Sequence, residues 1–139
     1  SIPVIANGDV IDSSTASGCL EATGASGLMI GRGAIGRPTI FYEIKRDLGW
    51  ITGPPPWGEG GDAIARQWCW NRYLELCEDI YGDSRNKNLK RHAVSFTKGL
   101  PGASAMRVDL HGEGDQRKLG RMVSEYLEGL ASLNEATAA

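Results

Sequence analysis

The sequence lacks long apolar runs and has little cysteine. No run approaches the roughly 18 apolar residues that a membrane-spanning helix needs, so we expect no membrane span. The three cysteines are an odd number and form no CxxC pair. A disulfide framework and a zinc site are therefore both disfavoured, and we expect no metal. Buried free thiols in a reducing compartment fit better, which makes the cytoplasm the expected location.

The net charge is small, but the charges are unevenly distributed. Fifteen basic and 17 acidic residues leave a formal net charge of −2. Residues 59–83 carry six acids against two bases, and residues 109–139 carry six acids against three bases. Between them, residues 84–108 contain no acid and six bases: Arg85, Lys87, Lys90, Arg91, Lys98 and Arg107. A basic island in an acidic chain indicates a local anionic partner.

The first 48 residues alternate between strand and helix patterns. Two short apolar runs, at 2–6 and 27–30, predict strands. A helix capped by Asp12 or Ser13 is expected to follow the first strand and to stop at Gly24, and a helix over 39–48 is expected to follow the second. Strands that are apolar throughout are typical of parallel α/β sheets covered on both faces. Because the chain opens directly into such a strand, we expect it to be a fragment of a longer protein.

The rest of the chain changes from α/β to all-α. Residues 49–61 contain five glycines and three consecutive prolines, which predicts a linker. Helices are expected over 62–81, 84–98 and 115–133, with a break at 99–102. The expected faces are Ala65, Cys69, Tyr73, Leu76 and Ile80 for the first helix, Leu89, Ala93 and Phe96 for the second, and Leu119, Met122, Tyr126, Leu130 and Leu133 for the third. The sequence therefore predicts an α/β domain over 1–48 and an antiparallel helical bundle over 62–139.

Each predicted strand ends in a glycine-containing turn. Asn7-Gly8-Asp9 follows the first strand, and Gly31-Arg32-Gly33 follows the second, about 24 residues later. Such turns let backbone amides approach a phosphate, and the loops after the last two strands of a (β/α)8 barrel are a common phosphate site. Tight barrel turns without a ligand are the alternative. The G-x-G-x-x-G pattern at 31–36 does not indicate a dinucleotide-binding fold, because Pro38 interrupts the helix and no further strand follows.

Residues 1–48 resemble the end of the barrel in tRNA-dihydrouridine synthases. The resemblance lies in the stretches at 2–9, 23–25 and 29–38 and continues more loosely to about Arg107. It implies the last two β/α units of a (β/α)8 TIM barrel, and an enzyme that reduces the C5–C6 bond of tRNA uridines with FMN, recharged by NADPH. It also implies FMN-phosphate contacts at Asn7, Gly8, Asp9, Gly31 and Arg32. The family's catalytic cysteine, lysine and histidine lie earlier in the barrel, so we expect no catalytic residue here and an inactive isolated chain.

The basic island resembles the family's basic-plus-histidine signature, in the order Lys90-Arg91-His92. Lysine and arginine at helical spacing follow a phosphate backbone, which makes RNA binding salt-sensitive. The residues expected to contact tRNA are Lys87, Lys90, Arg91, His92 and Lys98. A merely solvated face is the alternative, and His92 is equally compatible with packing inside the bundle. We expect His111 to lie in a solvated loop, and the tryptophans to pack rather than stack on bases.

These observations favour a piece of a flavin-dependent tRNA-dihydrouridine synthase that is a monomer in its full-length form. The first alternative is another FMN-dependent TIM-barrel oxidoreductase, because a phosphate site does not identify a substrate. The second is a non-catalytic RNA-binding module.

Overall fold

The computed structural model describes residues 2–82 and 86–138, with side chains up to residue 133. The chain forms two compact units, Ser1–Pro55 and Pro56–Ala139. Each unit has its own hydrophobic core. Within the described residues, no helix is both long enough and apolar enough to cross a membrane.

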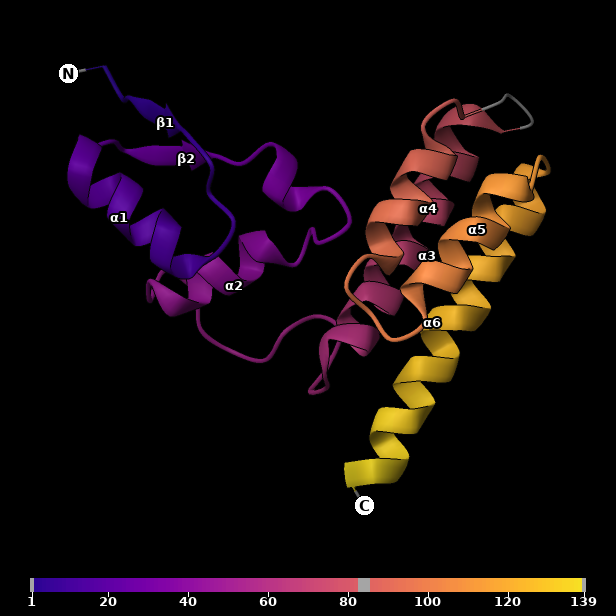
Figure 1. Ribbon diagram of the computed structural model, residues 1–139. Helices are drawn as coiled ribbons and strands as arrows, with labels where there is room; N and C mark the ends of the chain where they lie inside the picture. Colours follow the sequence, from indigo (N-terminus) through magenta and orange to yellow (C-terminus); the bar gives the residue numbers. More distant parts are fainter. Residues whose placement is uncertain (1, 83–85, 139) are drawn as a thin grey trace. The chain divides into compact units, whose positions relative to one another are not determined.

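The first unit is a parallel strand–helix–strand–helix arrangement (Figure 1). Strand β1 (Ile5–Asn7) pairs in parallel with β2 (Gly27–Met29). Helix α1 (Ser13–Thr23) connects the two strands, and a short 3₁₀ turn, η1 (Arg32–Ala34), precedes α2 (Ile40–Asp47). Parallel strands need a crossover of this kind. The predicted alternation of strand and helix is therefore confirmed for both strand–helix pairs of the first unit.

Helix α1 begins and ends where the sequence predicts. The Asp12 carboxylate accepts a hydrogen bond from the Thr15 amide at 2.8 Å, and the Thr15 hydroxyl accepts one from the Asp12 amide at 3.1 Å. The hydrogen bonds that the Asp12 carboxylate accepts from the Thr15 amide and the Thr15 hydroxyl lower the pKa of Asp12. At the other end Gly24 adopts φ 61°, the left-handed conformation in which glycine avoids the steric cost of a side chain.

The core of the first unit is small and leaves much of the sheet exposed. It is formed by Val10, Ala16, Ile40 and Ile44. Ile5 remains 59% exposed and Met29 50% exposed. The expectation that both faces of the strands are covered is therefore not met within this unit, because two strands and two helices are too few to enclose a sheet.

In the part of the chain that the structure describes, the second unit is a helical bundle formed by α3 to α6 (Figure 1). Helix α3 (Asp62–Tyr81) packs against α6 (Gln116–Ala138), and α4 (Leu89–Thr97) packs against both α5 (Ala103–Gly112) and α6. The fully buried side chains include Trp70, Leu110, Val123 and Leu127. The Trp70 Nε1 donates to the Gly120 carbonyl at 3.2 Å, which confirms that this tryptophan packs in the core.

Three expectations for the bundle need correction. Helix α4 begins at Leu89 rather than at residue 84, and residues 84 and 85 lie outside the described residues. The break at 99–102 separates α4 from α5, a helix that the sequence analysis did not predict, so His111 lies in a helix and not in a loop. Helix α5 was missed because it buries only Leu110 and so gives a weak periodic signal.

The predicted faces of the long helices are correct in part. On α3 the predicted Ala65 and Cys69 are buried and Tyr73 packs against the core, but Leu76 is 42% exposed and Ile80 is 72% exposed. On α6 the predicted Leu119 is buried and Met122 and Tyr126 pack against the core, whereas Leu133 is 65% exposed and the other buried positions are Val123, Leu127 and Ala131. The predicted α4 face of Leu89, Ala93 and Phe96 is confirmed as buried.

Candidate functional site

The turns that follow β1 and β2 line one pocket of about 900 Å³. Parallel strands carry their carboxyl ends to the same edge of a sheet, so residues 7–9 and 31–33 meet although about two dozen residues separate them. All five residues predicted from the sequence for this site lie in its lining: Asn7, Gly8, Asp9, Gly31 and Arg32. Gly33, Val10, Ile11 and Met29 complete it.

Backbone amides in this pocket are available as donors. The turn and loop hydrogen bonds of the described chain include none donated by the amides of Asp9, Arg32 or Gly33. Free amides at the ends of parallel strands are the donors that proteins offer to phosphate oxygens. A Cβ added at Gly8 or Gly31 would meet nothing within 4 Å, so the pocket has open space on that side.

Gly33 has a different role, which the sequence analysis did not assign. A Cβ at this position would lie 2.4 Å from the Val10 carbonyl oxygen. Such a contact is sterically impossible without a backbone shift. Gly33 therefore allows the turn after β2 to lie directly against Val10, which follows the turn after β1.

Charge in the pocket is balanced between two side chains. The Arg32 Nη2 lies 2.7 Å from the Asp9 Oδ1, and the two side chains are 88% and 87% exposed. An exposed pair of this kind contributes little to stability. Its effect is to orient the guanidinium beside the open turns, while the Asp9 carboxylate itself would repel a phosphate. Asp9 could thus contact an anion through its backbone amide and orient the Arg32 guanidinium toward it. Its own carboxylate would not bind the anion.

The predicted basic residues of the bundle fall into two groups. Lys87 precedes α4, Arg91 lies on it and Lys98 follows it, and all three are exposed. The Lys90 Nζ instead donates to the His111 carbonyl at 3.0 Å, so its ammonium is engaged at the end of α5. Arg85 lies outside the described residues. We refer to Lys87, Arg91 and Lys98 as the basic edge.

His92 is half-buried and turned toward the bundle on one side. Its Nδ1 lies 2.8 Å from the Tyr73 hydroxyl, and the two rings meet edge to face at 5.3 Å between centroids. Burial, and secondarily the Arg91 charge, lower the pKa of His92. The imidazole is therefore neutral near pH 7.

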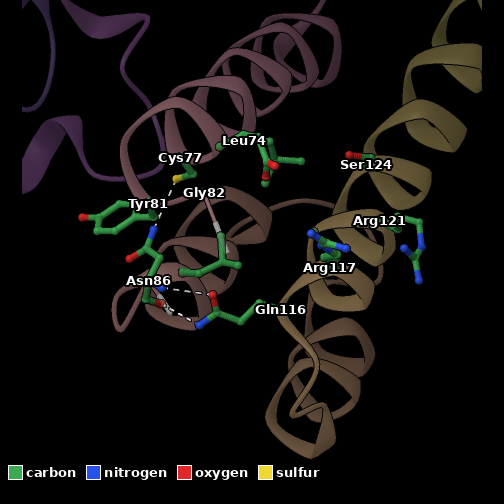
Figure 2. Close-up of a pocket in the computed structure, with 12 residues that line it drawn as sticks. Leu74, Cys77, Tyr81, Gly82, Asn86, Gln116, Arg117, Arg121 and Ser124 are labelled. Carbon is green, nitrogen blue, oxygen red and sulfur yellow. Dashed lines mark hydrogen bonds between the residues drawn. The ribbon is translucent and has the colours of Figure 1, made fainter. Parts of the chain in front are cut away.

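A second pocket, of about 520 Å³, lies between α3 and α6 (Figure 2). Arg117, Arg121 and Ser124 line it from α6, and Cys77, Glu78 and Tyr81 line it from α3. These residues are not among those predicted from the sequence. The four-residue spacing of the two arginines on the polar side of a predicted helix was the available signal.

The three cysteines are free and lie on two helices. Cys19 lies on α1, while Cys69 and Cys77 lie on α3, and all are free thiols. Cys69 is buried and the other two are partly buried. The side chains that the structure describes include no cluster of three or more histidine, cysteine or acidic residues able to hold a metal.

Together these features define an α/β unit with a pocket at the carboxyl ends of parallel strands, followed by a helical bundle with a basic edge. Comparison with known proteins then identifies the family. A model of the dihydrouridine synthase (Dus) family matches residues 1–129. The chain therefore belongs to the tRNA-dihydrouridine synthase family.

Individual relatives are consistent with this match. The tRNA-dihydrouridine synthase B of Yersinia pestis is 42% identical over 98 residues, which cover 69% of this chain and 29% of that protein. The enzyme of the same name from Escherichia coli K12 gives the same identity and coverage. A probable tRNA-dihydrouridine synthase of Mycobacterium tuberculosis (strain CDC 1551 / Oshkosh) is 33% identical over 112 residues, covering 76% of this chain and 26% of that protein. The chain thus spans less than a third of the length of these relatives.

Proposed function

We propose that this chain is the C-terminal part of a flavin-dependent enzyme that reduces the C5–C6 bond of tRNA uridines. The observation that carries the proposal is the convergence of Asn7–Asp9 and Gly31–Gly33 on one pocket at the ends of two parallel strands. Family membership supplies the substrate class, tRNA, and the oxidoreductase chemistry.

The pocket residues fit the phosphate of FMN. Uncommitted amides at Asp9, Arg32 and Gly33 supply directional donors, and the Arg32 guanidinium supplies positive charge. The open space beside Gly8 and Gly31 leaves room for the phosphate to approach the backbone. Bound FMN would supply the hydride for uridine reduction, with NADPH as the source of electrons. The residues of this chain would hold and orient the cofactor without reacting themselves.

The helical bundle is proposed to bind tRNA through its basic edge. Lys87, Arg91 and Lys98 are exposed at or beside α4, where no acidic residue lies in the same stretch of sequence. Arginine and lysine at such an edge contact phosphates and position the RNA, whereas base selection belongs to the catalytic domain. This combination favours a tRNA enzyme over an FMN barrel enzyme for small substrates. The strand-end pocket, in turn, argues against a purely RNA-binding module.

The test is Arg32→Ala in the full-length enzyme that contains this segment. The variant should bind FMN about 10- to 100-fold more weakly, since a charge-assisted hydrogen bond contributes roughly 1.5–3 kcal/mol. Its affinity for tRNA should stay within about twofold, which converts to a few tenths of a kcal/mol. Lys45→Ala, which removes a cation on α2 outside the pocket lining, is the matched control. An unchanged FMN dissociation constant for Arg32→Ala would refute the assigned phosphate site.

A further inference from the structure

The side-chain amide of Asn86 has only one orientation that satisfies its neighbours. Asn86 is 5% exposed, and its Oδ1 accepts a hydrogen bond from the Asn88 amide at 2.9 Å. A backbone amide only donates, so the other amide atom must be the nitrogen. The Asn86 Nδ2 then donates to the Tyr73 hydroxyl oxygen at 3.0 Å and to the Cys77 Sγ at 3.2 Å.

The backbone of Asn86 is held just as firmly by α6. The Gln116 Oε1 accepts from the Asn86 amide at 3.0 Å, and the Gln116 Nε2 donates to the Asn86 carbonyl at 2.9 Å (Figure 2). Figure 2 shows this pair of bonds side by side, with the Cys77 contact on the opposite side of Asn86. Asn86 therefore connects α3 to α6 immediately before the basic edge begins.

The orientation of Asn86 favours one direction for the next hydrogen bond. The Tyr73 oxygen accepts from Asn86, which favours a hydroxyl hydrogen directed at the His92 Nδ1, 2.8 Å away. Burial raises the pKa of Tyr73, so the phenol keeps this hydrogen at all ordinary pH values. An imidazole that accepts at Nδ1 and is neutral carries its own hydrogen on Nε2.

The Nε2 of His92 is not fully enclosed by the bundle. The described side chains contain only two buried nitrogen or oxygen atoms without a partner, Thr39 Oγ1 and Arg66 Nε. His92 Nε2 is neither of these and has no hydrogen-bond partner among the described residues, so part of its surface is open. It lies on the helix that also carries Arg91.

We propose that Tyr73, held by Asn86, is a positioning residue that keeps His92 in its Nε2–H form, and that this N–H donates to a phosphate oxygen of bound tRNA beside Arg91. The inference rests on the proposed tRNA binding of the basic edge. It adds a short-range, directional donor to a surface otherwise made of long, flexible cations. A neutral N–H keeps its hydrogen-bonding ability at high salt better than a screened charge does.

The first experiment measures the tautomer directly in the 139-residue chain. Long-range ¹H–¹⁵N NMR at neutral pH should show His92 with its hydrogen on Nε2 in the wild type. Tyr73→Phe removes the hydroxyl and keeps the ring, so the spectrum should shift toward a mixture of the two neutral tautomers. Tyr126→Phe is the matched control, because that hydroxyl donates to the Pro101 carbonyl at 2.6 Å and contacts no histidine. A wild-type spectrum with hydrogen on Nδ1 would overturn the proposal.

The second experiment measures tRNA affinity with the same proteins. His92→Ala should weaken binding about 10- to 100-fold, the range expected for one hydrogen bond to a charged acceptor. His92→Gln, which retains an N–H donor near the position of Nε2, should recover most of this loss, and Tyr73→Phe should cost roughly two- to threefold. If His92→Ala binds like wild type while loss of Lys87 and Arg91 weakens binding, the inference fails and the proposed tRNA surface stands. If neither His92→Ala nor the loss of Lys87 and Arg91 weakens tRNA binding, both the inference and the proposed tRNA surface are refuted.

Discussion

Removal of Lys87 and Arg91 together tests the basic edge most directly. Both side chains are exposed, and neither has a recorded ion-pair partner in the described part of the chain. We therefore expect Lys87→Ala with Arg91→Ala to leave the bundle folded, because its core residues are untouched. We expect the double variant to lose two phosphate contacts with tRNA.

The size of the effect follows from counterion release. Each phosphate contact contributes roughly 0.7–0.9 to the slope of log affinity against log salt, so two contacts contribute about 1.4–1.8. Over a fourfold rise in salt, from about 50 to 200 mM, wild type should lose about 7- to 12-fold more affinity than the variant. Lys90 should contribute less than either residue, since its ammonium is already bonded to the His111 carbonyl.

The assay is a salt titration of tRNA binding by fluorescence anisotropy, with several unrelated tRNAs. All should be weakened about equally, because phosphate contacts carry no sequence information. The control is Arg72→Ala with Lys118→Ala, which removes the same charge from cations already paired with Glu75 and Glu113. If the control flattens the slope as much as the Lys87/Arg91 variant does, net charge rather than the basic edge controls binding, and the reasoning is refuted.

Three further outcomes are expected. Gly33→Ala should destabilise the first unit by about 1–3 kcal/mol, as overpacking does, whereas Gly31→Ala should be tolerated, and hydrogen exchange of residues 1–48 would show the difference. The hydrogen bond from Lys118, followed by one from the Asp115 amide, lowers the pKa of Glu113 from 4.5 to about 2. The stabilising effect of the ionised Glu113 is thus present above about pH 4.5 and lost toward about pH 2, so Glu113→Gln should flatten acid unfolding in that window. Finally, the purified 139-residue chain should not reduce tRNA uridine, because two strands cannot enclose a flavin ring; measurable dihydrouridine formation would contradict this.

The α/β half of the chain was predictable because its signals are local. Asp12 and Gly24 define the two ends of α1 through capping interactions that depend on a few neighbouring residues. Glycine turns after apolar runs indicated where the pocket lies. What the sequence could not provide was the close contact that makes Gly33 necessary, since that contact comes from the tertiary approach of Val10.

The bundle was predictable in kind and less so in detail. Periodicity located α3 and α6, but it selected exposed Leu76 and Ile80 on α3 in place of the buried Trp70. Apolar residues occur on more than one side of that helix, and only the packing of α6 decides which side is buried. Likewise, the engagement of Lys90 depends on α5, an element too weakly amphipathic to predict.

The separation of the chain into two units with independent cores has an evolutionary consequence. A substitution at Ile44 and one at Val123 share no packing partner, so their effects on folding should simply add. Selection can therefore change the charge of the basic edge without destabilising the turns that line the strand-end pocket.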